Sequence, residues 1–332
     1  MSITLSGPPW TAVIAAKTLK RKPLSIHFQQ QPVVLFRSDD RVAALLDRCP
    51  HRGAQLSTGK ICGTSLQCPY HGWQFDISGH QTGFPGVPAT GKCPAFSVKA
   101  FEAMEEGGLI WLREQVPGAD SAKRFLPEVH HSHTCFTVTT SINAKLVDVA
   151  ENFLDALHTH LIHPGIVRSR NRQRHACDVS VTQVEDGYQA LYVETKQQSG
   201  LVSRLFGQHI RHSIGRIRHP GIVEIEYHSD NGIELSVVIY LRQETEQCCQ
   251  LIVRNYFRRR MIPGWLQQAV LAPFLYLTLK QDKHILESSA LHLSRYPDFQ
   301  PIISRYDVMR PYIEKALKGQ IDDTYERLQL ML

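Results

Sequence analysis

Hydrophobic and polar positions alternate along most of the chain, and the spacing of the apolar positions changes near residue 115. Before that point, short apolar runs at 33–36 and 42–46 flank the polar turn 37–41, which predicts a β-hairpin. Gly and Pro stand at most of the later joints between apolar runs. The first 115 residues are therefore expected to form a small antiparallel β domain.

Beyond this point the apolar pattern becomes longer. Residues 141–163 place apolar side chains at helical spacing without an internal Gly or Pro, which predicts one helix. The alternating stretches 178–196 and 221–259 contain turn signals, and they predict hairpins of one antiparallel sheet. Further helices are expected at 263–291 and 304–319. A sheet with helices laid on one face gives an α+β second domain.

Length and composition describe an ordinary globular protein. A chain of 332 residues with 42% hydrophobic and 20% charged residues can bury the cores of two domains, which we expect at 1–115 and 116–332. The net charge of +6 favours an acidic partner or an anionic ligand, but the basic residues are too dispersed to indicate nucleic acid.

The longest apolar run, at 269–279, is too short to cross a membrane and contains Pro273. Eight Cys without a secretory leader indicate reduced thiols or metal ligands. We therefore expect a soluble, cytoplasmic protein that binds neither membranes nor nucleic acid.

Two Cys–His pairs lie close together in the first domain: Cys49 with His51, and Cys68 with His71. Zinc sites usually combine a pair of Cys with a pair of His, whereas each pair here mixes the two residue types. Mixed pairs suit a two-iron cluster in which both Cys bind one iron and both His bind the other. This is the Rieske arrangement.

The motifs Cys-x-His-Arg-Gly at 49–53 and Cys-x2-His-Gly-Trp at 68–73 strongly resemble those of Rieske proteins. The resemblance implies a [2Fe-2S] cluster bound by the two Cys and two His named above. A structural zinc site is the alternative.

A second motif, Asp-x2-His-x4-His, runs from Asp155 through His158 to His163 and is followed by Pro164. On a helix, Asp155 and His158 would lie on the same face. His163 would lie about 140° round an ideal helix from His158, so the two rings could share a metal only where the helix widens or ends. Pro164 gives the helix a reason to end there. His160 lies outside this pattern and is interpreted as a bystander.

The order of these motifs resembles the Rieske non-heme iron oxygenases along nearly the whole chain. The resemblance implies a sheet of the helix-grip kind after the Rieske domain, with His158 and His163 binding a mononuclear Fe(II). Such iron takes two His and one carboxylate, and in this family the carboxylate comes from a late helix. Asp282 fits that pattern, with Glu287 as the reserve.

By the same resemblance, Asp155 is not a ligand but a catalytic bridge between a cluster His of one subunit and an iron His of the next. Imidazole N–H groups opposite a metal need such a partner to fix their tautomer and orientation. The route implies a ring of subunits, and the resemblance implies a homotrimer. Asn152 resembles an Asn that lies near the iron in some members, and its role stays open.

The sequence is therefore expected to encode the terminal oxygenase of a Rieske system, which hydroxylates or oxidatively demethylates an organic substrate, such as an aromatic one, with O2. The chain contains no Gly-x-Gly-x-x-Gly motif, so NAD(P)H would be oxidised by a separate reductase, with or without a ferredoxin. The alternatives are a cis-dihydroxylating ring dioxygenase, a Rieske electron-transfer protein, and a zinc-stapled ligand-binding domain. The substrate is not determined by the sequence.

Overall fold

A computed structural model of the chain describes residues 3–4, 8–86, 96–116, 125–127, 133–168, 174–195, 210–259 and 263–332. The chain divides into two compact units. The smaller unit consists of residues 6–126 and 242–244, and the larger unit consists of residues 1–5, 127–241 and 245–332. The domain boundary expected between residues 115 and 116 stays a prediction.

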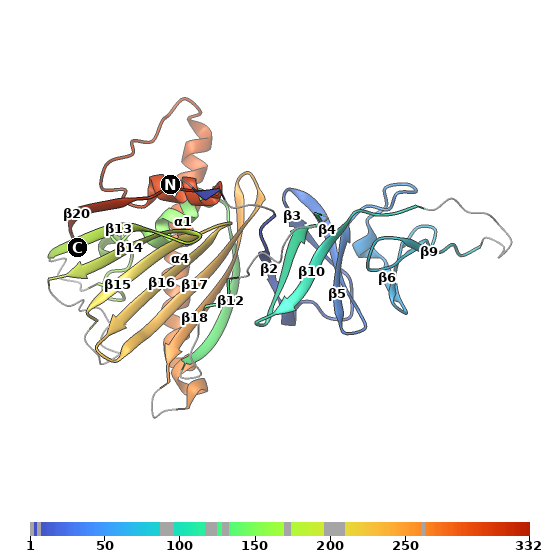
Figure 1. The fold of residues 1–332 in the computed structure, drawn as a ribbon, viewed down its shortest axis with the longest axis horizontal. Helices are drawn as coiled ribbons and strands as arrows, with labels where there is room; N and C mark the ends of the chain where they lie inside the picture. The colour runs from blue at the N-terminus through green and yellow to red at the C-terminus, as the bar shows by residue number, and fades with distance from the viewer. Residues whose placement is uncertain are drawn as a thin grey trace. The chain divides into compact units, whose positions relative to one another are not determined.

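The smaller unit contains two antiparallel sheets (Figure 1). Their strand orders are β2-β11-β10-β5-β4-β3 and β6-β7-β8-β9. The strands of the larger sheet are β2 (Thr11–Ala15), β3 (Leu24–Phe28), β4 (Gln31–Ser38), β5 (Arg41–Leu46), β10 (Ala100–Glu106) and β11 (Leu109–Glu114). Those of the smaller sheet are β6 (Lys60–Cys62), β7 (Ser65–Gln67), β8 (Gln74–Phe75) and β9 (Gln81–Gly83). Strands β4 and β5 pair in the predicted hairpin, which confirms the expected antiparallel β structure.

Strand β4 is buried on both faces, which explains its continuous apolar run. Val33 and Leu35 belong to one hydrophobic core of the unit. Val34 and Phe36 belong to a second core, which also contains Cys49 and Cys68 together with Leu56, Leu66 and Phe75. The Cys–His motifs are therefore anchored by their Cys residues in a packed core.

The larger unit is built on one eight-stranded antiparallel sheet with the order β12-β18-β17-β16-β15-β14-β13-β20. Its strands are β12 (His133–Ile142), β13 (Ala176–Val184), β14 (Gly187–Glu194), β15 (His212–Arg218), β16 (Ile222–Ser229), β17 (Gly232–Thr245), β18 (Cys248–Arg258) and β20 (Tyr325–Met331). The hairpins β13–β14, β16–β17 and β17–β18 turn at the positions that the sequence predicted. A separate two-stranded pair joins β1 (Ile3–Thr4) to β19 (Gln320–Ile321).

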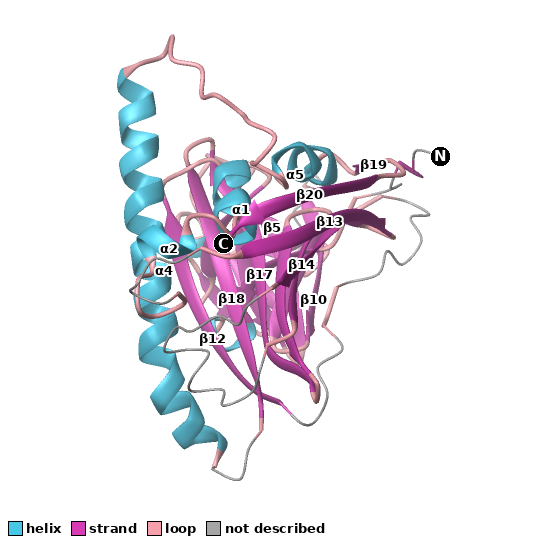
Figure 2. Ribbon diagram, turned by 90° about the vertical axis from the view of Figure 1, so that its left-hand side faces the viewer, coloured by secondary structure: helices cyan, strands magenta, loops and turns pink. Residues whose placement is uncertain are grey.

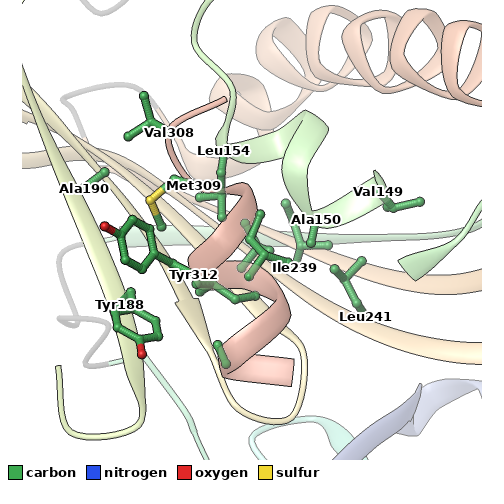
Figure 3. Close-up of a cluster of buried hydrophobic side chains, with 14 of the residues drawn as sticks. Val149, Ala150, Leu154, Tyr188, Ala190, Ile239, Leu241, Val308, Met309 and Tyr312 are labelled. Carbon is green, nitrogen blue, oxygen red and sulfur yellow. The ribbon is translucent and has the colours of Figure 1, made fainter. Parts of the chain in front are cut away.

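Helices pack on one face of this sheet. They are α1 (Leu146–Leu154), α2 (Thr159–Ile162), α4 (Gly264–Arg295) and α5 (Arg310–Leu317). Figure 2 shows α4 as a long helix running along the sheet. In the buried cluster of Figure 3, Leu154 of α1 and Tyr312 of α5 meet Tyr188 and Ile239 of the sheet. The α+β fold class is confirmed, and no described helix is long and apolar enough to span a membrane.

The single helix predicted at 141–163 is wrong. Strand β12 continues to Ile142, and helix α1 ends at Leu154. The carboxylate of Asp155 accepts hydrogen bonds from the backbone N–H groups of Leu157 (2.7 Å) and His158 (3.2 Å). A short acidic side chain that bonds to nearby N–H groups competes with the helical pattern, so the helix is interrupted there.

The sequence prediction also missed strand β20, which follows the last helix and pairs with β13. The alternation of Leu328 and Leu330 with polar residues is the signal that could have revealed it. Leu330 is buried in the core of the larger unit. This strand forms one edge of the eight-stranded sheet.

Candidate metal centres and cavity

The two Cys–His motifs fold into loops with the same backbone hydrogen bonds. In each loop the Cys N–H donates to the carbonyl five residues on, at 2.8 Å for Cys49 and 2.8 Å for Cys68. The N–H four residues on donates back to the Cys carbonyl, at 2.9 Å and 3.2 Å. That fourth residue is Gly53 or Gly72, with φ of 73° and 74°, a left-handed conformation that favours Gly. The matching loops fix the starting direction of each Cys and His side chain.

The side chains of these loops gather at one place. Cys49 and Cys68 are buried, and the rings of His51 and His71 lie 4.5 Å apart between centroids. The Trp73 ring stacks on His51 at 4.4 Å. Burial raises the pKa of the Cys49 thiol, an effect that the backbone N–H of His51 opposes and the neighbouring Cys68 thiol reinforces. The Nδ1 atom of His51 is buried without a partner among the described residues, so the four residues fit a Rieske [2Fe-2S] cluster.

His158 and His163 flank the single turn of helix α2 in the larger unit. Their rings lie 5.3 Å apart between centroids, with planes at 78°. The interruption of the helix at Asp155 and the end of α2 at His163 bring the two rings together, which a continuous helix would not do.

Asp282 projects from α4 toward both rings. Its Oδ1 lies 3.0 Å from Nε2 of His163 and 3.5 Å from Nε2 of His158. One ligand atom from each of the three residues falls within 4.8 Å of the others. Burial works against the charged form of Asp282, but hydrogen bonds from the two imidazoles lower the pKa of its carboxyl group. Two His and one buried carboxylate that converge in this way fit mononuclear Fe(II).

Each imidazole of this triad has an oxygen atom close to its other nitrogen, which makes a hydrogen bond at His163 and a close contact at His158. Gln281 Oε1 lies 2.9 Å from Nδ1 of His163, and Asp155 Oδ2 lies 3.3 Å from Nδ1 of His158. Because Gln281 Oε1 can only accept, Nδ1 of His163 donates to it, and Nε2 is the nitrogen that would bind a metal. Burial disfavours protonation of His158, but the carboxylates of Asp155 and Asp282 outweigh it and raise its pKa to about 9 in the metal-free site.

Three other residues that the sequence singled out are not part of the triad: Glu287, His160 and Asn152. Glu287 accepts hydrogen bonds from the backbone N–H and the side-chain amide of Asn143, both at 3.0 Å, so its position favours Asp282 as the carboxylate. His160 is buried on α2 but is not part of the triad. Asn152 lines the adjacent cavity, and its buried Oδ1 has no partner among the described residues.

A cavity of about 180 Å³ opens beside the triad, inside the larger unit. His158, His163 and Asp282 form part of its wall. Most of the remaining wall is aliphatic and comes from α1, α4 and strands β15 to β18, including Leu154, Ile214, Ile225, Val237, Leu275 and Leu279. Such a cavity can hold an organic molecule against the triad while excluding water.

Sequence reasoning did not identify the polar residues of this cavity. Arg168, Glu194, Tyr227 and Asn255 all line it. Three of them lie in or at the end of strands where the alternation of residue types gives no sign of which face borders a cavity. Arg168 follows the iron motif by only five residues, and this proximity is the signal that could have singled it out.

Residues 9–102 match the Rieske [2Fe-2S] domain family. Methylxanthine N1-demethylase NdmA of Pseudomonas putida is 31% identical over 151 residues, which cover 45% of this chain and 43% of that protein. The oxygenase component of dicamba O-demethylase of Stenotrophomonas maltophilia is 41% identical over 105 residues, covering 31% of this chain and 30% of the relative. The alignments thus span less than half the length of these curated relatives.

The fold extends the likeness to nearly the whole chain. The crystal structure of dicamba monooxygenase bound to 3,6-dichlorosalicylic acid superposes with a TM-score of 0.77 at 24% identity, covering 95% of this chain and 97% of that chain. At this identity the superposition establishes the fold. The resemblance seen in the sequence is confirmed: the chain carries a Rieske [2Fe-2S] domain followed by a sheet-rich domain, and it is similar to Rieske non-heme iron oxygenases in sequence and in fold.

Proposed function

We propose that the protein is the terminal oxygenase component of a multicomponent Rieske system and inserts oxygen from O2 into an organic substrate. The observation that carries this proposal is the convergence of His158, His163 and Asp282 on the wall of a largely apolar cavity, in a chain that also contains a Rieske domain. A protein that only transfers electrons needs no such cavity. A closed structural zinc site would place no organic binding space beside its ligands.

The roles of the protein's own residues follow from their contacts. Cys49, His51, Cys68 and His71 would hold the cluster, and His158, His163 and Asp282 would hold the iron. When bound, the two groups would supply electron transfer and O2 activation. Gln281 and Asp155 hold the two imidazoles so that each Nε2 faces Asp282. The aliphatic cavity wall excludes water and orients the substrate beside these ligands.

Hydroxylation, including the hydroxylation that leads to oxidative demethylation, is the reaction class that we favour. Relatives of this chain are named as an N-demethylase of methylxanthines and as the oxygenase component of an O-demethylase. The second candidate, cis-dihydroxylation of an aromatic ring, would use the same metal ligands. Analysis of the product with 18O2 distinguishes the two reactions, because the first incorporates one oxygen atom and the second incorporates two.

Electrons would come from NAD(P)H through a separate reductase, directly or through a ferredoxin. We also propose a homotrimer in which Asp155 links the two metal centres across a subunit boundary. Two observations support the assembly. The Asp155 side chain is one-third exposed although it contacts the ring of His158. The outer side of α4 exposes Trp265, Tyr276 and Leu291, an apolar surface that association between subunits would cover.

The experiment that tests the function is reconstitution. The purified protein would be supplied with NADH, a Rieske-system reductase and candidate methylated or aromatic compounds, and O2 uptake and products would be measured. We expect O2 uptake to be coupled to formation of an oxygenated product. Metal-loaded protein that accepts electrons but forms no oxygenated product from any compound that binds in the cavity would contradict the proposal.

A further inference from the structure

The cavity has a polar corner formed by Arg168, Glu194 and Tyr227, none of which belongs to the metal triad. Arg168 Nη1 donates to Glu194 Oε2 at 2.7 Å, and the two side chains are only 6% and 12% exposed. Arg168 Nε donates to the hydroxyl of Thr159 at 3.2 Å. The polar corner is therefore a buried ion pair in an otherwise mostly aliphatic wall.

The polar corner keeps hydrogen-bonding capacity beyond its internal contacts. A guanidinium carries more N–H donors than the two that Thr159 and Glu194 engage. Burial raises the pKa of the Tyr227 phenol, and its hydroxyl forms no hydrogen bond with the described residues. A buried guanidinium is costly unless its remaining donors find partners. A molecule bound in the cavity can supply them.

The polar corner is built into the same segment that carries two of the proposed iron ligands. Thr159, which holds Arg168, directly follows His158. The chain then turns after His163, and the N–H of Gly165 donates to the carbonyl of Arg168 at 2.6 Å. A molecule that contacts Arg168 therefore lies in the same cavity as the triad, and its position relative to the triad is fixed by this short segment.

The charges of the polar corner determine what kind of molecule it accepts. An isolated Arg in an apolar wall would favour an anion, but the carboxylate of Glu194 offsets that attraction at close range. An uncharged oxygen acceptor gains the guanidinium hydrogen bond without that repulsion. The aliphatic remainder of the wall favours an apolar body.

We propose that the cavity selects an uncharged, mostly apolar organic molecule, that Arg168 binds a carbonyl, ether or hydroxyl oxygen of it, and that Glu194 disfavours anionic analogues. This inference deepens the proposed function and rests on it for the statement that the bound molecule is a substrate. Arg168 and Glu194 are thereby specificity residues.

The test compares two probes of the same shape, 4-tert-butylbenzamide and 4-tert-butylbenzoate. Binding is measured by isothermal titration calorimetry on the purified, metal-loaded, oxidised protein, without a reductant and therefore without turnover. We expect the amide to bind at least about tenfold more tightly than the benzoate, the ratio that corresponds to one good hydrogen bond against one close repulsion. In Glu194→Gln the benzoate should gain about tenfold relative to the amide, because Arg168 keeps an acceptor but loses the opposing charge.

Matched variants separate this role from a purely structural one. Glu224→Gln removes a carboxylate that is also buried, at 5% exposed, that pairs with Arg216 at 2.9 Å and does not line the cavity, so it should leave the ratio unchanged. Arg168→Lys should retain part of the affinity for the amide, whereas Arg168→Met should weaken binding of the amide without improving binding of the benzoate, because the donor is lost and Glu194 remains. Thermal unfolding of each variant confirms that it is folded.

Three results would overturn the inference: equal or tighter binding of the benzoate to the unmodified protein, no binding of either probe, or an unchanged ratio in Glu194→Gln. Failure of the proposed function looks different. A protein that binds the amide with the expected preference but contains no iron would disprove the oxygenase proposal and leave the selectivity of the cavity intact. An active oxygenase whose cavity prefers anions would support the oxygenase proposal and disprove the proposed selectivity of the cavity.

Discussion

Replacing Gln281 by Leu should weaken binding of iron at the triad by roughly 10- to 100-fold while leaving the Rieske cluster in place. Among the described residues, Gln281 Oε1 accepts the one hydrogen bond from Nδ1 of His163, at 2.9 Å, and the His163 side chain is only 3% exposed. Without that acceptor, the metal-bound ring buries an unpaired N–H group, which costs about 1–3 kcal/mol. The metal-free ring can instead carry its proton on Nε2, which lies 3.0 Å from Asp282 Oδ1, so the cost appears in the affinity for the metal.

Two estimates of the expected loss of iron affinity agree. A cost of about 1–3 kcal/mol corresponds to a change of roughly 5- to 150-fold in affinity, because about 1.4 kcal/mol equals a factor of ten. This range includes the loss that removal of a ligand's outer hydrogen-bond partner usually causes. Gln281→Glu keeps an acceptor at the same place and should bind iron about as tightly as the unmodified protein.

The assay is an anaerobic titration of Fe(II) against a chromophoric chelator, with protein whose mononuclear site has been emptied. Gln267→Leu is the matched control, since Gln267 is also buried on α4 and donates to the carbonyl of Arg258 at 2.8 Å. It lies about 20 Å along the helix from Gln281. Gln267→Leu should lower the stability of the protein and leave its iron affinity unchanged. Unmodified affinity in Gln281→Leu, or an equal loss in Gln267→Leu, would refute the reasoning.

Further predictions concern the triad and the residues beside it. Asp282→Asn should reduce mononuclear iron to a small fraction and stop oxygenation, whereas Glu287→Gln should retain both. Metal analysis and O2 uptake measure the two effects. The opposite pattern would mean that Glu287, and not Asp282, is the carboxylate ligand. Asp155→Asn should keep both metal centres but lower substrate oxidation by roughly 10- to 100-fold in single turnover of the pre-reduced protein, and an unchanged rate would remove Asp155 from the electron route. The raised pKa of His158, about 9 in the metal-free site, means that iron must displace a proton at neutral pH. Apparent iron affinity should therefore rise about tenfold per pH unit from pH 7 to about 9 and then level off, and a flat profile would contradict this. By the same linkage, protonated His158 stabilises the metal-free fold below about pH 6.5, and this contribution is lost as the pH rises through about 9.

The sequence allowed the cluster loops to be predicted more closely than the iron site. Cys49 and Cys68 lie in short motifs whose Gly residues adopt left-handed conformations, so local residues determine most of the loop geometry. The triad depends on contacts between distant segments, because His163 and Asp282 belong to α2 and α4, which only the packed sheet brings together. For Asp282 the choice over Glu287 rested on resemblance.

The helix interruption shows why periodicity alone was insufficient. Residues 141–163 have an apolar pattern that suits one helix, yet Asp155 takes the backbone N–H groups of the next turn and ends α1. The same pattern could not reveal the polar corner of the cavity. Arg168 and Glu194 are charged residues that would normally be assigned to a solvated surface, and only the folded chain shows them as a buried pair.

We propose that one chain holds both a Rieske cluster and a separate mononuclear iron. The most direct test is a count of iron, zinc and acid-labile sulfide in the purified protein, together with electron paramagnetic resonance of the dithionite-reduced form. We expect roughly three irons and two sulfides per chain, little zinc and a Rieske-type signal, with His158→Ala losing one iron and keeping the signal. Stoichiometric zinc in place of iron, or a His158→Ala variant that keeps all its iron, would contradict the account.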